Sequence, residues 1–420
     1  MLFNKETILF NINSVPVIGN FDTGSLIGLT ESGKAFCDKI INSGIEAENV
    51  EPENLELFQA LCQAGFFEEI CVNKSLSAYL HVTQRCNLHC VGCYSLDSDR
   101  NCLKDPSTEQ VKRAISQLAQ NGCQLLVISG GEPFLRKDLG EILQYAKNEA
   151  QIARVQIITN GTFLTIEMLQ QVKPYVDGIA VSIDGYSKKN PTFIRDEGIF
   201  DKVISAVKLT KKAGIDTTIL PTIHTKNSDA MMEYVKLSKK LKVGISYSLL
   251  TCSPKDSVLK EWLPTNKQLS RIAEELIEIG LDGAVAVNDM PIGDGLDARK
   301  SCEVGCKIVS VGADGTVYPC HMLHDRRLAM GNIFEENLSD IMTTDIAITC
   351  KNLHVDNFDV CNKCKHRYIC GGGCRARSFY VYDNLTSHDF YCSMTKTYFD
   401  WISDQLEKMY KQCSLFYIKL

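Results

Sequence analysis

The sequence predicts an α/β fold in which parallel strands and helices alternate to build part of a barrel. Three observations lead to this fold class. Between about residues 78 and 290, short apolar segments alternate with longer segments of helical periodicity, as in βα units that form a parallel sheet. Six such units suit an open, partial (β/α)6 barrel of the TIM type. Glycine-rich and polar motifs follow several strands, at the end of a parallel sheet where ligands bind.

Length and composition limit the remaining possibilities. The 420 residues leave room for two or three domains, and we place them at 1–72, 73–290 and 291–420. The net charge of −6 gives no reason to expect a nucleic-acid partner. There is no apolar run of about 18 residues, so we expect no membrane span. The first residues lack the order of a signal peptide, and we expect a cytoplasmic protein.

The N-terminal unit, residues 1–72, carries strand and helix signals of its own. Residues 22–25 (Asp-Thr-Gly-Ser) supply turn chemistry between two strands, and Thr30 is placed to cap a helix. Acidic residues far outnumber basic ones in this unit. The expected strands cover residues 7–12 and 26–29, and the expected helices cover residues 30–41 and 53–64.

The middle unit, residues 73–290, holds the repeated βα pattern, without tandem repeats or low-complexity segments. The expected strands cover residues 78–84, 124–128, 154–159, 178–183, 216–223 and 243–250. The expected helices cover residues 107–120, 137–149, 165–173, 200–213, 228–241 and 266–280.

Cysteine usage indicates the chemistry. The chain has 19 cysteines, and in a compartment that keeps thiols reduced this favours metal binding or catalysis over disulfides. Cys86, Cys90 and Cys93 follow the first barrel strand with the spacing C-x3-C-x2-C. Iron–sulfur clusters and closed zinc sites normally take four protein ligands, so three thiolates leave one metal position open for a small molecule. The alternative is a zinc site completed by His81 or His89.

This motif resembles that of the radical S-adenosylmethionine (SAM) enzymes. By that resemblance, Cys86, Cys90 and Cys93 hold a [4Fe–4S] cluster whose fourth iron chelates the amino and carboxylate groups of SAM. The residue before the last cysteine is usually aromatic in the family and packs near the adenine, whereas here it is Gly92. We expect Tyr94, directly after that cysteine, to substitute. The resemblance also implies the partial-barrel fold.

A glycine-rich motif follows the second barrel strand. Gly130 and Gly131 permit close approach of the backbone to a ligand, and Glu132 offers an acceptor for an ammonium group. The stretch reads equally well as a plain turn. By its place after the strand that follows the cysteines, it resembles the family's site for the SAM amino group.

Polar residues end the third and fourth barrel strands. Asn160, Ser182 and Asp184 stand there, and by resemblance these positions line the SAM and substrate pocket, with Ser182 facing the ribose. Arg195 resembles an arginine that pairs with the SAM carboxylate. Ordinary turn chemistry is an alternative for the first three residues, and a surface ion pair is an alternative for Arg195.

The C-terminal unit, residues 291–420, is rich in cysteine. Residues 290–300 read as a linker, and residues 308–320 read as a hairpin that turns at Asp314-Gly315. Eight clustered cysteines follow the linker, besides two scattered ones, and eight are enough to ligate two cubane clusters. Two zinc sites are the alternative, because C-x2-C is a common zinc spacing. The eight are Cys302, Cys306, Cys320, Cys361, Cys364, Cys370, Cys374 and Cys392.

This arrangement resembles the SPASM extension of radical SAM enzymes, which carries two auxiliary [4Fe–4S] clusters. The resemblance implies that Gly371-Gly372-Gly373 lets the chain pivot between the clusters. Because both clusters are fully ligated, we expect them to transfer electrons. The expected cofactors are three [4Fe–4S] clusters and SAM. The first auxiliary cluster is assigned to Cys302, Cys306, Cys320 and Cys374, and the second to Cys361, Cys364, Cys370 and Cys392.

The N-terminal unit loosely resembles the small winged-helix peptide-binding domains of ribosomal-peptide maturation systems. The resemblance rests on residues 21–40 (FDTGSLIGLTESGKAFCDKI) and 57–68 (LFQALCQAGFFE). In those systems the leader of a precursor peptide adds a strand to an exposed sheet edge. A structural cap on the barrel is the alternative. The acidic composition argues against an acidic leader.

Together these resemblances imply a peptide maturase. SAM would be cleaved to a 5′-deoxyadenosyl radical, which abstracts hydrogen from a ribosomally made precursor and leads to a thioether or other intramolecular crosslink. The expected partners are that precursor and a low-potential electron donor such as flavodoxin or ferredoxin. The alternatives are a sulfatase-maturase-like enzyme that oxidises a serine or cysteine, and a non-enzymatic zinc-binding peptide scaffold.

One departure from the sulfatase-maturing enzymes concerns a base. In those relatives an aspartate follows the hairpin cysteine, whereas His321 stands at that place here. A histidine can take a proton near neutral pH. The simpler interpretation is a hydrogen-bonded structural residue beside the cluster.

Overall fold

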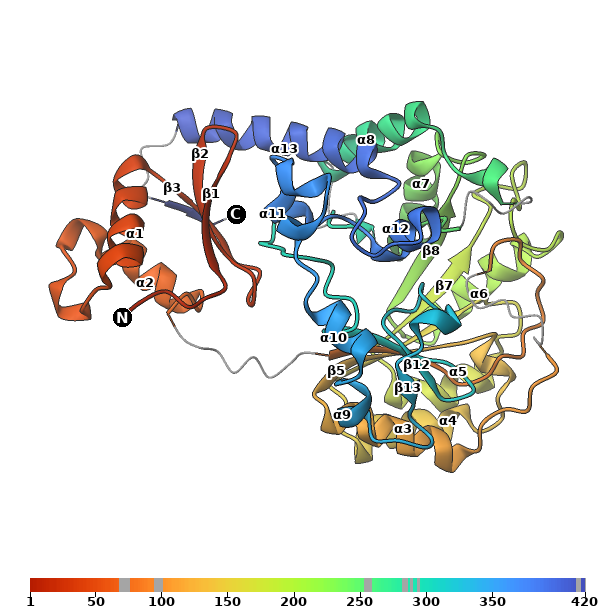
Figure 1. Ribbon diagram of the computed structural model, residues 1–420. Helices are drawn as coiled ribbons and strands as arrows, with labels where there is room; N and C mark the ends of the chain where they lie inside the picture. The colour runs from red at the N-terminus through yellow and green to blue at the C-terminus, as the bar shows by residue number, and fades with distance from the viewer. Residues whose placement is uncertain are drawn as a thin grey trace.

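The computed structural model describes most of the chain, and the described strands form two sheets. Figure 1 shows a small N-terminal unit, coloured red to orange, beside a larger body. Among the described helices there is none with the length and hydropathy that a membrane span requires. The described residues are 1–67, 76–93, 101–252, 259–281, 286–287, 290–292, 295–412 and 417–419.

The larger body is built on a parallel sheet, which confirms the predicted partial barrel. Each strand pairs in parallel with the next from the first to the last barrel strand. The strands are β4 (Leu76–His81), β5 (Cys123–Ser129), β6 (Arg154–Thr159), β7 (Gly178–Ile183), β8 (Thr217–Ile223), β9 (Gly244–Leu249) and β10 (Ala286–Val287). The helices are α3 (Thr108–Gln120), α4 (Leu139–Gln144), α5 (Ile166–Val172), α6 (Phe200–Lys212), α7 (Met231–Leu241) and α8 (Asn266–Leu281).

The helices cover one face of this sheet because their apolar residues recur at helical spacing. In α3, Val111, Ala114, Ile115 and Leu118 are buried in one core with the barrel strands. The helix begins at a capping box, in which Ser107 accepts a hydrogen bond from the backbone of Gln110 and the Gln110 side chain accepts one in return. With one face covered, the loops at the carboxyl ends of the strands are left to build a site.

The cysteine-rich C-terminal region extends the same sheet. Strand β11 (Ile308–Val311) pairs in parallel with β4 and antiparallel with β12 (Thr316–Tyr318), and β13 (Gly331–Asn332) pairs with β12. The sheet order is therefore β10-β9-β8-β7-β6-β5-β4-β11-β12-β13, and it crosses the expected boundary at residue 290. Short helices and one long helix, α13, follow. They are α9 (Leu338–Ile341), α10 (Asp345–Lys351), α11 (Arg367–Cys370), α12 (Arg375–Tyr382) and α13 (Cys392–Gln412).

The N-terminal unit is an antiparallel sheet with two helices packed against it. Thr30 accepts a hydrogen bond from the backbone of Gly33 and caps the first helix, as expected. The sequence analysis missed the middle strand, because Pro16 lowers the strand signal; Pro16 lies near the hairpin turn, opposite Asn11. The elements are β1 (Thr7–Ile12), β2 (Val15–Asn20), β3 (Leu26–Leu29), α1 (Glu31–Ser43) and α2 (Leu55–Gln63).

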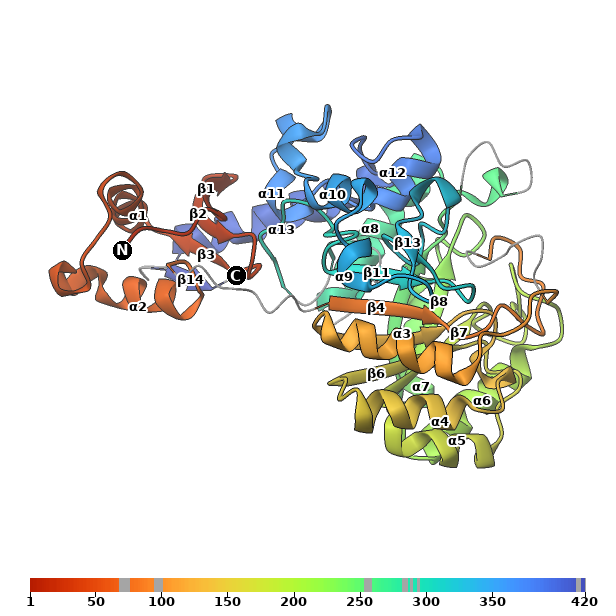
Figure 2. The ribbon, with the colours of Figure 1, turned by 60° about the horizontal axis from the view of Figure 1, so that its bottom comes forward.

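The end of the chain returns to this unit. Helix α13 contacts the β1–β2 turn, where Asn13 donates to Asp404 at 3.0 Å and Ser14 donates to Glu407 at 2.6 Å. Beyond it, β14 (Tyr417–Lys419) pairs antiparallel with β3, so the small sheet has the order β1-β2-β3-β14. Figure 2 shows β14, in blue, beside β3. The sequence analysis did not predict this fourth strand.

Candidate active site and cluster-binding cysteines

The loop that leaves β4 toward Cys86 is held by backbone contacts with the glycine-rich motif after β5. The amide of Gly131 donates to the carbonyl of Thr83 at 2.7 Å, and the amide of Glu132 donates to the carbonyl of Arg85 at 2.8 Å. A Cβ atom on Gly131 would lie 2.1 Å from the Arg85 carbonyl oxygen, and one on Gly130 would lie 2.3 Å from that of Thr83. The two glycines therefore allow close approach to the cysteine loop. Their contact with SAM stays a prediction.

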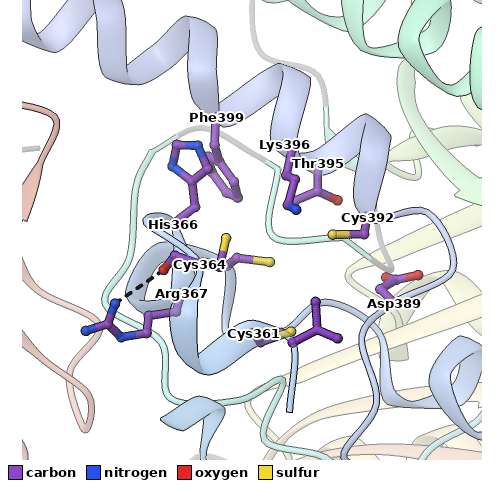
Figure 3. A pocket seen from close by; sticks show the side chains of 12 residues that line it. Cys361, Cys364, His366, Arg367, Asp389, Cys392, Thr395, Lys396 and Phe399 are labelled. Atoms are coloured by element: carbon purple, nitrogen blue, oxygen red, sulfur yellow. Dashed lines mark hydrogen bonds between the residues drawn. The ribbon is translucent and has the colours of Figure 1, made fainter. Parts of the chain in front are cut away.

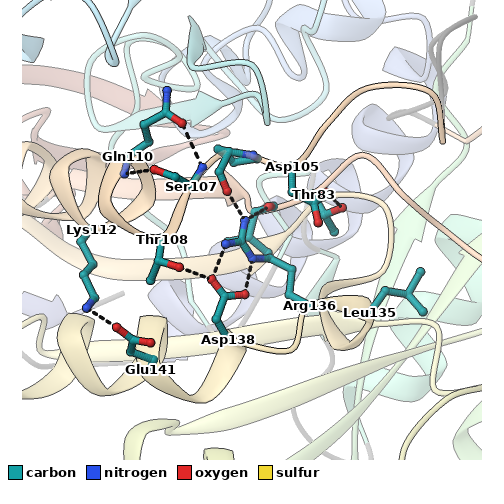
Figure 4. Close-up of polar contacts among 12 residues, drawn as sticks. Thr83, Asp105, Ser107, Thr108, Gln110, Lys112, Leu135, Arg136, Asp138 and Glu141 are labelled. Atoms are coloured by element: carbon teal, nitrogen blue, oxygen red, sulfur yellow. Dashed lines mark hydrogen bonds and ion pairs between the residues drawn. The ribbon is translucent and has the colours of Figure 1, made fainter.

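A charged network that the sequence analysis missed supports the same loop (Figure 4). The buried guanidinium of Arg136 donates to the carbonyl of Val82 at 2.8 Å and is paired with Asp138, which lowers the pKa of Asp138 to about 2. Asp105 accepts from the Thr83 hydroxyl at 2.5 Å and from Arg85. Charges that bind main-chain groups in this way fix the path of the loop. No sequence motif marked them.

Two polar side chains reach the predicted cluster ligands. The amide nitrogen of Asn160, at the end of β6, lies 3.7 Å from the sulfur of Cys86. The guanidinium of Arg195 lies 3.8 Å from the sulfur of Cys90. Burial raises the pKa of Cys90, and the charge of Arg195 opposes that rise. Both side chains were predicted site residues, so the structure brings Asn160 and Arg195 to the cysteine loop. Tyr94 lies outside the described residues.

Glu132 connects the glycine-rich motif to the end of β6. Its side chain is fully buried. Its carboxylate accepts hydrogen bonds from the Thr159 hydroxyl at 2.7 Å and from the backbone amide of Asn160 at 2.8 Å. Burial raises the pKa of Glu132, against the opposing effect of these hydrogen bonds. Glu132 thereby positions Asn160 beside Cys86. Its expected contact with the SAM amino group stays a prediction.

Asp184 organises the segment that carries Arg195. One carboxylate oxygen of Asp184 accepts from the backbone amides of Ile194 at 2.9 Å and Arg195 at 3.0 Å. Within the described part of the chain, the other oxygen of Asp184 and the Nε of Arg195 are buried without a hydrogen-bond partner. Buried polar atoms without partners are costly. The Nε of Arg195 is a donor of the kind that fits a ligand carboxylate, and the Asp184 oxygen is an acceptor of the kind that fits an ammonium group. Ser182, two residues before Asp184 at the end of β7, is also buried.

Four C-terminal cysteines line one pocket (Figure 3). They come from three elements: a 3-10 turn at Cys361–Lys363, helix α11, and the first residue of α13. Burial raises the pKa of Cys392 to about 11 and also raises that of Cys370, so an uncompensated thiolate is disfavoured here and a bound metal would supply the missing charge. The four are Cys361, Cys364, Cys370 and Cys392, the set assigned to the second auxiliary cluster.

The other four cysteines come from the loop before the hairpin, the end of the hairpin and the residue that precedes α12. The amide of Gly305 donates to the carbonyl of Pro319 at 2.9 Å, which joins the loop of Cys302 and Cys306 to the end of the hairpin. Among the described residues, no three Cys, His, Asp or Glu side chains are close enough to share one metal ion. A [4Fe–4S] cluster does not require this, because each iron takes a different sulfur. This set is Cys302, Cys306, Cys320 and Cys374.

The glycine triplet between the two sets adopts the expected pivot. Gly371, Gly372 and Gly373 have φ angles of 61°, 82° and 74°, a region that favours glycine. A Cβ on Gly373 would lie 2.6 Å from the Asp389 carboxylate, which accepts from the amide of Cys374 at 2.7 Å. The triplet therefore turns the chain from Cys370 in one set to Cys374 in the other.

His321 packs between a predicted cluster ligand and the barrel. Its ring stacks on Tyr79 of β4, with centroids 3.9 Å apart, and its Nδ1 lies 3.6 Å from the sulfur of Cys320. Burial lowers the pKa of His321 to about 3, so the ring is neutral near pH 7. This environment suits the structural interpretation. The role as a base stays a prediction.

Two family models match parts of this chain. The radical SAM superfamily model matches residues 80–238, which include the Cys86 loop. The model of the iron–sulfur cluster-binding domain called SPASM matches residues 302–365. The chain is a radical SAM enzyme with a C-terminal SPASM domain.

Two relatives with different activities have sequences similar to this radical SAM enzyme. The Fe-coproporphyrin III synthase of Methanosarcina barkeri is 28% identical over 353 residues, which cover 75% of this chain and 87% of the relative. The mycofactocin maturase MftC of Mycolicibacterium smegmatis is 27% identical over 329 residues, which cover 76% of this chain and 81% of the relative.

Solved structures share the fold. The structure of native anSMEcpe with bound AdoMet has a TM-score of 0.64 at 18% identity, and the match covers 80% of this chain and 99% of that one. Streptococcus suis SuiB, also with bound S-adenosylmethionine, has a TM-score of 0.59 at 17% identity and covers 93% of this chain and 100% of its own. The part of this chain that the SuiB match leaves uncovered is shorter than residues 1–67. The SuiB match therefore extends into the N-terminal unit.

Proposed function

We propose that this enzyme modifies a ribosomally made precursor peptide, abstracting hydrogen from it and closing a thioether or other intramolecular crosslink. The N-terminal unit carries the proposal. It is a small antiparallel sheet whose β3 edge pairs with an extended backbone segment, the mode in which peptides bind by strand addition. The match to SuiB extends into the same unit, and SuiB has been solved bound to the precursor peptide SuiA. This supports a peptide substrate here.

Under this proposal, the site residues have separate roles. Cys86, Cys90 and Cys93 would hold three irons of a [4Fe–4S] cluster and leave the fourth for SAM. When bound, the reduced cluster and SAM supply a 5′-deoxyadenosyl radical that takes hydrogen from carbon. Asn160 and Arg195 donate toward the cysteine sulfurs and would fix the cluster and the SAM carboxylate beside it.

The remaining parts of the chain would serve the same reaction. The two C-terminal cysteine sets would hold auxiliary [4Fe–4S] clusters that carry away the electron released when the crosslink closes. A low-potential donor such as flavodoxin or ferredoxin would reduce the Cys86 cluster. The cytoplasm is the compartment that suits reduced thiols and such a donor.

A tetrapyrrole substrate is the second candidate, because the Fe-coproporphyrin III synthase of M. barkeri is among the relatives. The strand-pairing N-terminal unit favours the peptide, since a rigid macrocycle has no backbone to add to a sheet. Supplying a tetrapyrrole in place of a peptide separates the two candidates, because only one class of substrate should be consumed with formation of 5′-deoxyadenosine.

The direct test is mass spectrometry of a candidate precursor, taken from short open reading frames beside this gene and co-expressed with the enzyme. We expect a product that has lost two hydrogen atoms. Cys90→Ala should abolish it, whereas Cys102→Ser, at an exposed cysteine, should not. Turnover of a tetrapyrrole without any peptide product would overturn the proposal.

Docking is tested separately. Deleting residues 1–70 should abolish precursor binding, but it also exposes apolar C-terminal residues, because Ile12, Val15 and Val17 share a core with Leu353 and Phe358. A gentler variant is Gly28→Pro, which removes one backbone donor from β3. Undiminished precursor binding by both variants would count against docking at this unit.

A further inference from the structure

The three N-terminal strands of the small sheet have two edges, on β1 and on β3, and these edges face different surroundings. Strand β1 lies against the C-terminal domain: the ring of Phe10 packs on Tyr368 with centroids 5.2 Å apart, and Glu6 pairs with Lys300 at 2.6 Å. On the opposite side, among the described residues, the edge of β3 pairs with one short strand, β14, with Ile418 opposite Gly28. An incoming strand can therefore reach β3 only by taking the place of β14.

Strand β14 is short, which suits a strand that can leave the sheet. It contributes three residues, and a strand of this length makes few ladder hydrogen bonds. The polar contacts that hold α13 against the β1–β2 turn, from Asn13 and Ser14, are exposed. Because those contacts are made by the helix, they remain in place when β14 departs.

We propose that β14 is a resident competitor at the peptide-docking edge, and that the peptide which replaces it has the chemistry of this tail. The statement rests on the proposed peptide substrate. Residues 414–420 read SLFYIKL, a mostly apolar stretch with one lysine and no acidic residue. The N-terminal unit carries many more acidic than basic residues, so an apolar leader segment that is neutral or basic fits this edge and an acidic one does not.

The register identifies the backbone groups involved. Across β2 and β3, the amide of Asn20 donates to the carbonyl of Ser25 at 2.9 Å, so Ser25 faces β2. In an antiparallel ladder successive residues face opposite sides, so Gly28, three positions on, faces β14 and exchanges hydrogen bonds with Ile418. The amide of Lys419, one residue further, points away from β3.

Proline substitutions test this difference between the Ile418 and Lys419 amides, because proline has no backbone N–H to donate. Ile418→Pro removes the donor that pairs with β3, whereas Lys419→Pro is the matched control in the same strand. By hydrogen–deuterium exchange of the full-length enzyme, we expect the segment containing Gly28 to exchange at least tenfold faster in Ile418→Pro and near the wild-type rate in Lys419→Pro. Equal exchange in all three proteins would overturn the proposal.

A binding experiment tests the competition without a precursor. A fluorescein-labelled SLFYIKL peptide should bind a chain that ends at Gln412 at least tenfold more tightly than it binds the full-length chain. The same peptide with proline at the position of Ile418 should not bind. Equal affinity for both chains would overturn the proposal. A precursor that binds neither chain, while the tail peptide binds as expected, would instead count against the proposed peptide substrate.

Discussion

At the scale of single residues, the site depends on main-chain geometry as much as on reactive side chains. Gly130 and Gly131 leave room for the carbonyls of Thr83 and Arg85, and Arg136 binds the carbonyl of Val82. These contacts fix the start of the loop whose cysteines would hold the cluster. A side chain at Gly131 would have to displace backbone, which cannot move without moving Cys86.

Gly131→Ala is therefore expected to lower the iron and sulfide content of the anaerobically purified enzyme, because a Cβ at this position meets the Arg85 carbonyl at 2.1 Å. Gly140→Ala is the matched control, since its Cβ would meet Gln171 at an ordinary 3.8 Å. Iron per chain checks both. Full iron content in Gly131→Ala would show that the loop tolerates displacement.

Arg195→Leu is expected to weaken SAM binding by about tenfold to a hundredfold, because a hydrogen bond to a charged group contributes about 1.5–3 kcal/mol. The control is Arg154→Leu, because Arg154 is exposed and begins β6, at the opposite end of that strand from Asn160. Equilibrium binding of SAM to the reconstituted enzyme measures both. Equal affinities in the two variants would leave Arg195 with a structural role only.

At the scale of elements, the C-terminal domain is organised by buried charge. The guanidinium of Arg377 in α12 is paired with the Asp389 carboxylate at 2.8 Å, and both side chains are nearly inaccessible. Burial alone would raise the pKa of Asp389, but Arg377 and backbone amides lower it overall. This pair joins α12 to the loop that leads into α13 and Cys392.

Asp389→Ala is expected to destabilise the protein by about 3–5 kcal/mol, because it leaves the charge of Arg377 buried and unpaired. Asp383→Ala is the control: it removes an exposed partner of Arg327, and exposed pairs contribute little. Denaturant unfolding of the two variants should separate them clearly. Similar midpoints would mean that Arg377 finds another acceptor.

At the scale of the whole molecule, the three parts of the chain are interleaved. The hairpin of the C-terminal domain extends the barrel sheet through β11 and β4, and the end of the chain extends the N-terminal sheet through β14 and β3. Helix α13 begins at Cys392 in the second cysteine set and ends near the N-terminal unit (Figure 1). One rigid element thus connects the proposed auxiliary cluster to the proposed docking unit.

The roles of the cysteine sets separate in a pair of variants. Cys90→Ala should abolish cleavage of SAM to 5′-deoxyadenosine, whereas Cys364→Ala should allow cleavage but yield no modified peptide, because the electron has no path away. The wild-type enzyme should carry roughly a dozen irons, as three cubanes require. A normal rate of product formation in Cys364→Ala would make the second auxiliary cluster dispensable. Zinc in place of iron would favour the scaffold alternative.

The sequence alone determined the barrel and the choice of cysteines. The alternation of strands and helices predicted each barrel strand from β4 to β9 within a few residues, since periodicity is a local property. The family resemblance assigned Cys361, Cys364, Cys370 and Cys392 to one set, and the structure gathers them around one pocket. The resemblance also implied Asn160 and Arg195 as site residues, and the structure brings both to the cysteine loop.

Only the tertiary structure decided which distant groups support these residues. Arg136 and Asp105 contact the cysteine loop through charge networks that leave no spacing in the sequence, and Asp389 meets Arg377 only after the chain folds. Strand β14 is the strongest case. Its pairing with β3 joins residues nearly 400 positions apart, and backbone hydrogen bonds of this kind depend on which edge is free, not on side-chain identity.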